Sequence, residues 1–110
     1  MKFKLFFDWN RTEANKSLKQ ITFRSSPIPV GAYNSILKPA WLRGQNLLSA
    51  MFGKPTNAGE YPALTKLAES GILYSHAWKT NEGYVYLGIG KQDGKLNLSI
   101  GFHKNQLAGN

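Results

Sequence analysis

Apolar residues occupy every second position near the end of the chain, from Leu96 through Leu98 and Ile100 to Phe102, and small or polar residues separate them. Successive side chains of a β-strand point to opposite faces, so this period predicts a strand with one buried face. A helix would need apolar residues every three or four positions. The segment therefore restricts the chain to folds that contain a half-buried β-sheet.

Two further segments extend this pattern into a meander. Val85, Leu87 and Ile89 alternate within residues 84–89, and residues 72–78 are rich in strand-forming types. A turn at residues 79–83 and a loop at residues 90–94, which contains an Asp-Gly pair, separate the strands. We expect three antiparallel strands. Their outer face would carry Tyr84, Tyr86, Asn97, Ser99 and His103.

The N-terminal region has the same period. Phe3, Leu5 and Phe7 alternate within residues 2–9, and Ile21 with Phe23 marks a second strand over residues 18–24. Together they predict a β-hairpin whose apolar residues face the core. The polar residues 10–15 between the strands are expected to form its turn, with a helical turn as the alternative.

Helical signals fill the middle of the chain, after a Pro- and Gly-rich break at residues 25–31. Asn34 or Ser35 can cap a short helical turn, and Pro39 suits the start of a helix over residues 39–52. Residues 60–70 predict a further helix. Its expected inward residues are Leu64 and Leu67, while the longer helix would bury Leu37, Trp41, Leu48, Met51 and Phe52.

The predicted fold is therefore a single α+β domain over residues 1–110, with an N-terminal β-hairpin, two to three helices and a C-terminal three-stranded antiparallel meander. The helix at residues 60–70, followed by strands, resembles the recognition helix and wing of a winged-helix domain. Its two Glu and one Lys argue against DNA reading, because a helix in the major groove lies between phosphates.

The residue types that are missing narrow the chemistry. The chain has no cysteine, which excludes disulfides, thiolate metal sites and a cysteine nucleophile, and which is typical of a reducing cytoplasm. Its carboxylates are scattered, and the sequence contains neither a phosphate-binding loop nor a G-x-S-x-G motif. We therefore expect no metal and no cofactor. No run is apolar enough for a signal peptide or a membrane span, so a cytoplasmic location is expected.

Charge is the strongest compositional signal. The chain carries a formal net charge of +8, and residues 1–55 hold nine Lys and Arg against two Asp and Glu, a net of +7. No acidic residue occurs between Glu13 and Glu60. A field of one sign attracts polyanions, so we expect a nucleic acid or an acidic protein surface as the partner. The alternative is that the basic surface only keeps the protein soluble.

Aromatic residues lie among the cations of the first half, a combination that binds bases by stacking and phosphates by charge. Trp9 and Phe6 are the candidates for base stacking, although a core position is favoured for Trp9 because tryptophan is usually well buried. The predicted nucleic-acid-binding residues are Lys4, Trp9, Arg11, Lys16, Lys19, Arg24 and Arg43.

His76 and His103, the two histidines of the chain, carry the alternative of catalysis. Two imidazoles with a nearby cation suffice for metal-free RNA cleavage, one as general base and the other as general acid. The strand alternation predicts that the two rings lie on opposite faces of the sheet, which disfavours catalysis by the pair.

Three hypotheses follow. The first is a non-enzymatic binding protein for nucleic acid or a nucleoprotein complex, such as a regulator or a mobile-element product. The second is a small toxin-like ribonuclease that uses the histidines. The third is an inhibitor or adaptor that binds an acidic protein surface.

Overall fold

The computed structural model describes the backbone of residues 3–11 and 16–104 and the side chains of residues 21–104. Its strands are β1 (Phe3–Arg11), β2 (Lys16–Ser25), β3 (Asn57–Ala58), β4 (Ile72–Lys79), β5 (Tyr84–Gln92) and β6 (Lys95–His103). Its helical elements are the short turns η1 (Val30–Ala32), η2 (Tyr33–Leu37) and η3 (Leu64–Lys66) and the single α-helix α1 (Lys38–Phe52).

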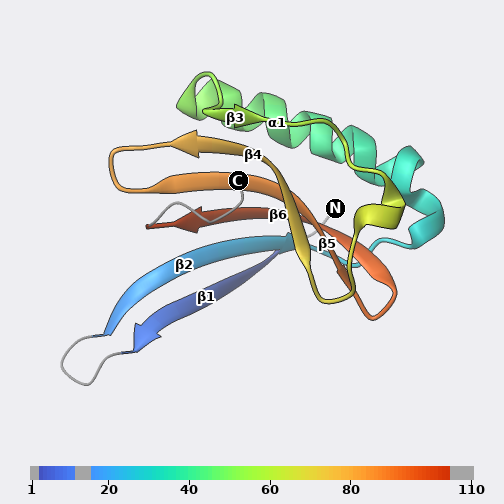
Figure 1. Ribbon diagram of the computed structural model, residues 1–110, viewed down its shortest axis with the longest axis horizontal. Helices are drawn as coiled ribbons and strands as arrows, with labels where there is room; N and C mark the ends of the chain where they lie inside the picture. Colours follow the sequence, from blue (N-terminus) through green and yellow to red (C-terminus); the bar gives the residue numbers. More distant parts are fainter. Residues whose placement is uncertain (1–2, 12–15, 105–110) are drawn as a thin grey trace.

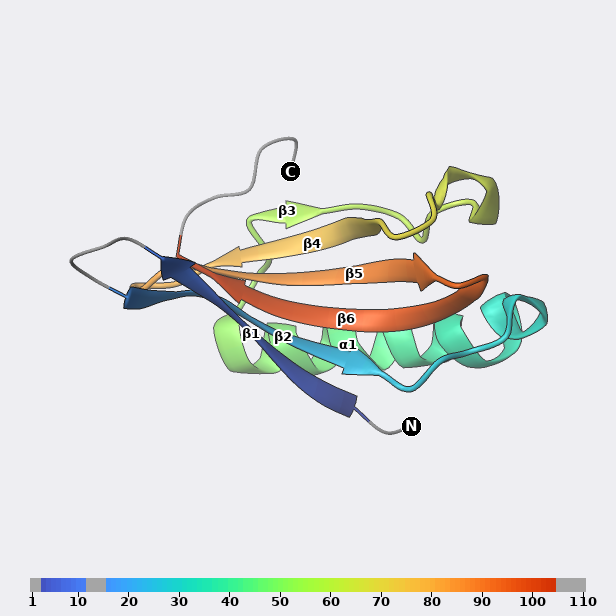
Figure 2. The same cartoon turned by 90° about the horizontal axis from the view of Figure 1, so that it is seen from below.

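All strands belong to one antiparallel sheet with the order β1-β2-β6-β5-β4-β3. The β1–β2 hairpin continues the sheet on one side and extends beyond the other strands, while α1 lies across one face (Figures 1 and 2). We call the face under α1 the helix face and the opposite one the far face. No helix within the described part of the chain is long and apolar enough to cross a membrane.

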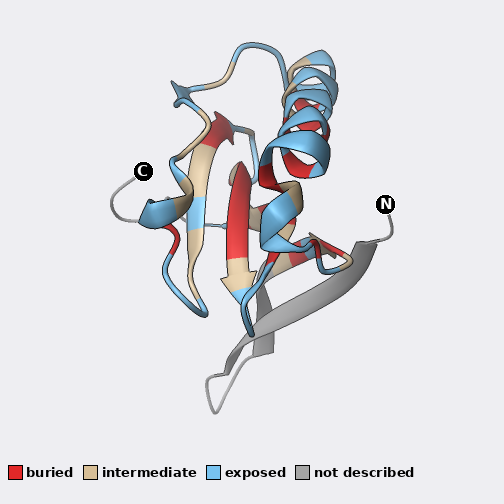
Figure 3. Ribbon diagram, turned by 90° about the vertical axis from the view of Figure 1, so that its right-hand side faces the viewer, coloured by how far each residue is buried: buried red, intermediate tan, exposed pale blue. Residues whose placement is uncertain are grey.

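The core lies between α1 and the two central strands, as the buried residues in Figure 3 show. The alternation that predicted β5 and β6 places Leu87, Ile89, Leu96 and Leu98 in this core, each at most 2% exposed. From α1 and the turn before it come Leu37, Ala40, Trp41 and Leu48. Burial of these apolar side chains is the main stabilising contribution to the fold.

α1 begins and ends as its sequence predicts. Pro39 lies in its first turn, and Gly53, which has a φ of 84°, donates its N–H to the Ser49 carbonyl at the end. Gly44 costs helix stability, but a Cβ there would lie 3.3 Å from Leu87 Cδ1. Glycine at this position therefore allows α1 to lie close to β5.

The predicted arrangement of an N-terminal hairpin, two to three helices and a three-stranded C-terminal meander is wrong, because the structure has one α-helix and one continuous antiparallel sheet. Residues 60–70 contain only the three-residue turn η3. Tyr61 and Pro62 are held against Tyr33 by two phenol-to-carbonyl hydrogen bonds, which keep this segment extended. The winged-helix resemblance loses its recognition helix for the same reason.

The hairpin and the last three strands are joined in one sheet through β2 and β6. β2 pairs with β6, with Gln20 opposite His103 and Arg24 opposite Ser99. Arg24 and Ser99, which face each other in this pairing, are about 75 positions apart in the sequence. Local periodicity carries no information about such a contact.

Several inward assignments were wrong as well. Phe23 is paired with Ile100 on the helix face, as expected for β2, but it is 44% exposed, while Thr22 on the opposite face is 2% exposed. Met51 and Phe52, expected in the core, are 63% and 40% exposed because they lie on the flanks of α1. The expected inward residues Phe3, Leu5 and Phe7, and the turn at residues 10–15, lie outside the residues whose side chains are described.

Candidate functional site

The far face of the sheet carries polar and aromatic residues from four strands. Residues directly opposite each other in an antiparallel pair share a face. Tyr84 is paired with His103, and Gly88 with both Ser99 and Tyr74. The far face therefore includes Thr22, Arg24, Ile72, Tyr74, Tyr84, Tyr86, Gly88, Gly90, Asn97, Ser99, Gly101 and His103.

An aromatic cluster occupies the centre of this face. The ring of His103 lies 5.3 Å from that of Tyr86 and 6.1 Å from that of Tyr74, both edge to face. Tyr86, Ser99 and His103 were expected on an outer face, but each is at most 5% exposed. The sheet is thus buried on both sides of its central strands.

Glycines in β5 make this packing possible. A Cβ on Gly88 would lie 2.8 Å from both the Leu73 carbonyl oxygen and Tyr74 Cδ1, and one on Gly90 would lie 2.8 Å from Asn97 Oδ1. Gly90 was assigned to the hairpin loop, but it belongs to β5, and the loop between β5 and β6 is only Asp93 and Gly94. Positive φ at both residues confirms the predicted Asp-Gly turn.

Beside the aromatic cluster, the far face contains a small polar pocket, which we call the Arg24 pocket. Its volume is about 230 Å³. Its lining residues are Arg24, Ser70, Gly71, Ile72, Gly90, Lys91, Gln92 and Asn97. None of these residues is acidic. Arg24 is the far-face cation among them, because Lys91 is paired with the core residue Leu96 and its side chain therefore belongs to the helix face.

Backbone hydrogen bonds fix one wall of the Arg24 pocket. Ser70 donates its N–H to the Lys91 carbonyl at 2.7 Å, and Lys91 donates to the Gly71 carbonyl at 3.1 Å. Ser70 has a φ of 62°, a left-handed conformation that costs a non-glycine residue about 1–2 kcal/mol. Strained residues of this kind concentrate at functional sites.

Arg24 connects the pocket to the aromatic cluster. Burial raises the pKa of Tyr74, and the positive charge of Arg24 acts on it in the opposite direction, so the guanidinium lies within electrostatic reach of the phenol. Arg24 is half-buried. The Arg24 side chain therefore lies between the aromatic cluster and the pocket that it lines.

The structure brings only some of the sequence-predicted binding residues together. Lys4 is paired with Arg24 in the β1–β2 register, and Arg11 with Lys16. Arg43 is exposed on α1, whereas the far face is the opposite side of the sheet. The side chains of Lys4, Trp9, Arg11, Lys16 and Lys19 lie outside the described residues.

Sequence reasoning missed Lys91, Ser70 and Asn97, which line the same pocket as Arg24. Lys91 was counted with the weakly charged second half of the chain, yet it lines the same pocket. One signal was present: Gly88 and Gly90 are two apart in a strand, and glycine in a strand interior marks close approach of another group.

The two histidines lie on opposite faces of the sheet. His76 is paired with Leu87 on the helix face, where its ring packs against Trp41 and Trp78 and its Nδ1 lies 2.9 Å from Ser75 Oγ. Burial lowers the pKa of His76. His103 lies in the aromatic cluster of the far face, so the structure does not bring the two rings to one site.

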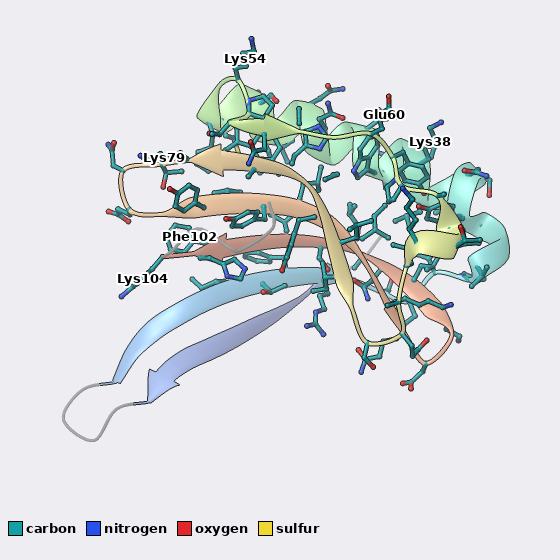
Figure 4. The ribbon with its side chains drawn as sticks, viewed as in Figure 1. Lys38, Lys54, Glu60, Lys79, Phe102 and Lys104 are labelled. Atoms are coloured by element: carbon teal, nitrogen blue, oxygen red, sulfur yellow. The ribbon has the colours of Figure 1, made fainter. Side chains whose placement is uncertain are left out.

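The helix side of the molecule has its own exposed apolar residues. Leu47 and Met51 on α1 are 57% and 63% exposed, and Phe23 on β2 is 44% exposed. Figure 4 shows Lys79, Phe102 and Lys104 near one end of the sheet and Lys38 and Lys54 around α1. A second pocket, of about 350 Å³, lies at this end of the sheet, and its lining residues are Phe52, Thr80, Asn81, Glu82, Val85 and Phe102.

Within residues 21–104, no group of three or more His, Cys, Asp or Glu is arranged to hold a metal ion. Comparison of the chain with protein-family models, with curated proteins and with solved structures gives no match. The chemistry of the site is therefore argued from its own residues.

Proposed function

We propose that this protein binds nucleic acid, alone or within a nucleoprotein complex, through the basic β1–β2 hairpin and the adjoining Arg24 pocket, without catalysing a reaction. The observation that carries the proposal is the cross-strand register, which pairs Lys4 with Arg24 and Arg11 with Lys16. We also propose a cytoplasmic location, as expected from the cysteine-free sequence.

Like charges directly opposite each other in an antiparallel pair destabilise it, each by a few tenths of a kcal/mol to about 1 kcal/mol. In β1 and β2 together there are five Lys and Arg and one Asp. Phosphates of a bound polyanion would relieve this repulsion, so the paired cations that destabilise the free hairpin would favour binding. A surface that needed only solubility would not require paired cations on one hairpin.

A charge-reversal experiment tests the proposal. Lys16→Glu with Lys19→Glu changes two cations of β2, and Lys66→Glu with Lys79→Glu makes the same charge change at two exposed positions of the second half. Binding of a labelled 20-nucleotide RNA and a DNA duplex is measured by fluorescence anisotropy at low salt. The hairpin variant should lose at least ten times more affinity than the control, because the two β2 positions would contact phosphate directly.

Equal losses in the two variants would refute the assignment to the hairpin, and no binding of either probe by the unchanged protein would refute the proposed function. Circular dichroism of both variants checks that they are folded.

A second candidate is docking of an acidic segment of another protein on α1. α1 contains two cations and no acidic residue, and its exposed Leu47 and Met51 offer apolar contact beside them. Poly-L-glutamate is the probe. Binding that is tighter than that of RNA at equal charge and weakened by Leu47→Ser would favour this candidate. Weaker binding than RNA would reject it.

The ribonuclease alternative has no supporting geometry. General acid–base cleavage needs both imidazoles within hydrogen-bond reach of one phosphate group, directly or through one water. His76 and His103 are 2% and 5% exposed and belong to opposite faces of the sheet.

A further inference from the structure

We infer that the outer edge of β1 is a dimerisation site, where two copies of this chain pair as antiparallel strands with Phe6 of one copy opposite Phe6 of the other. The inference goes beyond the proposed function and needs no nucleic-acid ligand. It is carried by the place of β1 in the sheet and by the self-complementary order of its residues.

β1 lies at an open edge of the sheet. It is the last strand in the order on one side, and among the described strands its neighbour is β2 alone. The hairpin extends beyond the other strands, and α1 does not run along its outer edge (Figure 1). An edge strand presents a row of backbone N–H and C=O groups that can pair with a strand of another chain.

The two edges of the sheet differ in how they are protected. Proteins commonly protect an edge with a very short strand or with proline. At the opposite edge, β3 consists of Asn57–Ala58 only, and Pro55 precedes it. β1 has nine residues and contains neither proline nor glycine. It is therefore long and regular enough to pair with a second strand.

The irregularity of the hairpin does not interrupt this edge either. Asp8 is paired with Gln20, and the next residue, Trp9, is paired with Leu18. The extra residue at this register shift is Lys19, so the bulge belongs to β2. β1 keeps a strict alternation of faces along its whole length.

The order of residues in β1 complements itself when the strand is reversed. In an antiparallel pair centred on Phe6, Lys4 of each copy lies opposite Asp8 of the other. A pair centred on Phe7 would instead place Phe6 opposite Asp8. With the centre at Phe6, every other pair within residues 3–9 joins apolar residues: Phe3 with Trp9, Leu5 with Phe7, and Phe6 with itself.

The register of the hairpin places both charges on one face. Lys4 is paired with Arg24 and Asp8 with Gln20, and both β2 residues belong to the far face. Lys4 of one copy and Asp8 of the other are therefore neighbours on the same side of a continuous sheet. Edge charges of a single sign would repel a second copy, whereas these two attract it.

The dimer is closed, because both copies use the same edge and are related by a two-fold axis through Phe6. The edges left outside are then the two short β3 strands, so the sheet does not grow further. The remaining cations of each hairpin lie outside the charge pairs, which makes the dimer compatible with nucleic-acid binding: Arg11, Lys16, Lys19 and Arg24.

Sedimentation velocity of the full chain, freed of nucleic acid, tests the inference at low salt and at concentrations from about 1 μM to 1 mM. Asp8→Lys and Lys4→Asp each turn both inter-copy charge pairs into like-charged pairs. Glu60→Lys makes the same charge change as Asp8→Lys at an exposed position outside β1. Circular dichroism checks that each variant is folded.

The unchanged protein and Glu60→Lys should form dimers. Asp8→Lys and Lys4→Asp should each weaken the dimer at least about tenfold, because two pairs change from attraction to repulsion. An equal mixture of these two variants should form a heterodimer, since each charge pair then joins opposite signs again. The double variant Lys4→Asp with Asp8→Lys should dimerise like the unchanged protein for the same reason.

An unchanged protein that stays monomeric up to about 1 mM would overturn the inference. A dimer that both single variants leave intact would also overturn it and would favour the exposed apolar residues of α1 as the interface. If Asp8→Lys does not fold, the comparison of Lys4→Asp with the double variant decides, and monomers in both would refute the charge pairing. None of these measurements includes a polyanion, so the proposed function stands or falls separately.

Discussion

Substitution of Gly88 by alanine tests the packing of the far face. A Cβ at this position would lie 2.8 Å from the Leu73 carbonyl oxygen, 2.8 Å from Tyr74 Cδ1 and 3.1 Å from Ile72 Cγ2. The Leu73 backbone has little freedom to move, because Leu73 and Tyr74 are both in register with β5. Overpacking of this kind costs about 1–3 kcal/mol.

Alanine also restricts the unfolded chain, which offsets about 0.4–1 kcal/mol of that cost. We therefore expect a net loss of about 1–2 kcal/mol in the free energy of unfolding. This corresponds to a fall in Tm of roughly 10 °C. Urea titrations followed by far-UV circular dichroism measure the change directly, since the signal reports the whole sheet.

Two other glycines serve as matched controls. At Gly90 the new Cβ would meet the end of the Asn97 side chain, which can rotate away, and at Gly31 nothing lies within 4 Å. The expected order of destabilisation is Gly88→Ala, then Gly90→Ala, then Gly31→Ala, with the last near zero. A Gly88→Ala protein as stable as the Gly31→Ala protein would refute the close approach of β4 to β5.

Three further predictions concern the stability of the protein. Burial lowers the pKa of His76, so the unfolded chain binds a proton on this imidazole more readily than the folded chain does, and the free energy of unfolding should fall as the pH drops below about 6.5. The fall should be smaller in His76→Gln. An identical fall in both proteins would contradict the expectation. Ser75→Ala should cost about 1–3 kcal/mol in urea titrations, because Trp41 Nε1 donates to Ser75 Oγ at 2.8 Å and would lose its acceptor; an unchanged midpoint would contradict this. Gly94→Ala should cost about 1 kcal/mol despite open space around it, because its φ is 72°, and an unaffected Tm would mean that the turn relaxes.

The strands were predictable because their signal is local. Alternation over a few residues located segments that overlap β1, β2, β4, β5 and β6, and the Asp-Gly pair located the last turn. The arrangement of the strands was not predictable in the same way. Pairing of β2 with β6 depends on a contact between distant segments, and no local pattern indicates which strands become neighbours.

Helix prediction failed where tertiary contacts override propensity. Residues 60–70 contain good helix formers, but Tyr61 and Pro62 are held against Tyr33 as an extended segment with one short turn. A register shift between Tyr74 and His76 was equally invisible in the sequence. It moves Tyr74 to the far face and leaves His76 under α1, so the strict alternation assumed for this strand does not hold.

The candidate site was partly predictable. Excess charge in the first half pointed to Arg24, which lines the polar pocket. Ser70 and Asn97 could not be found this way, because the strand order that brings them to the same pocket as Arg24 is a property of the folded sheet. Charge asymmetry along the sequence is therefore not the same as charge asymmetry in space.

Salt dependence of nucleic-acid affinity tests the central claim most directly. The Kd for a labelled single-stranded RNA is measured by anisotropy between 50 and 200 mM salt. If the five cations of β1 and β2 contact phosphates, affinity should fall about 100-fold over this range, since each contact to a single strand contributes a slope of about −0.7. An affinity that does not change with salt, or no binding at 50 mM, would contradict the account.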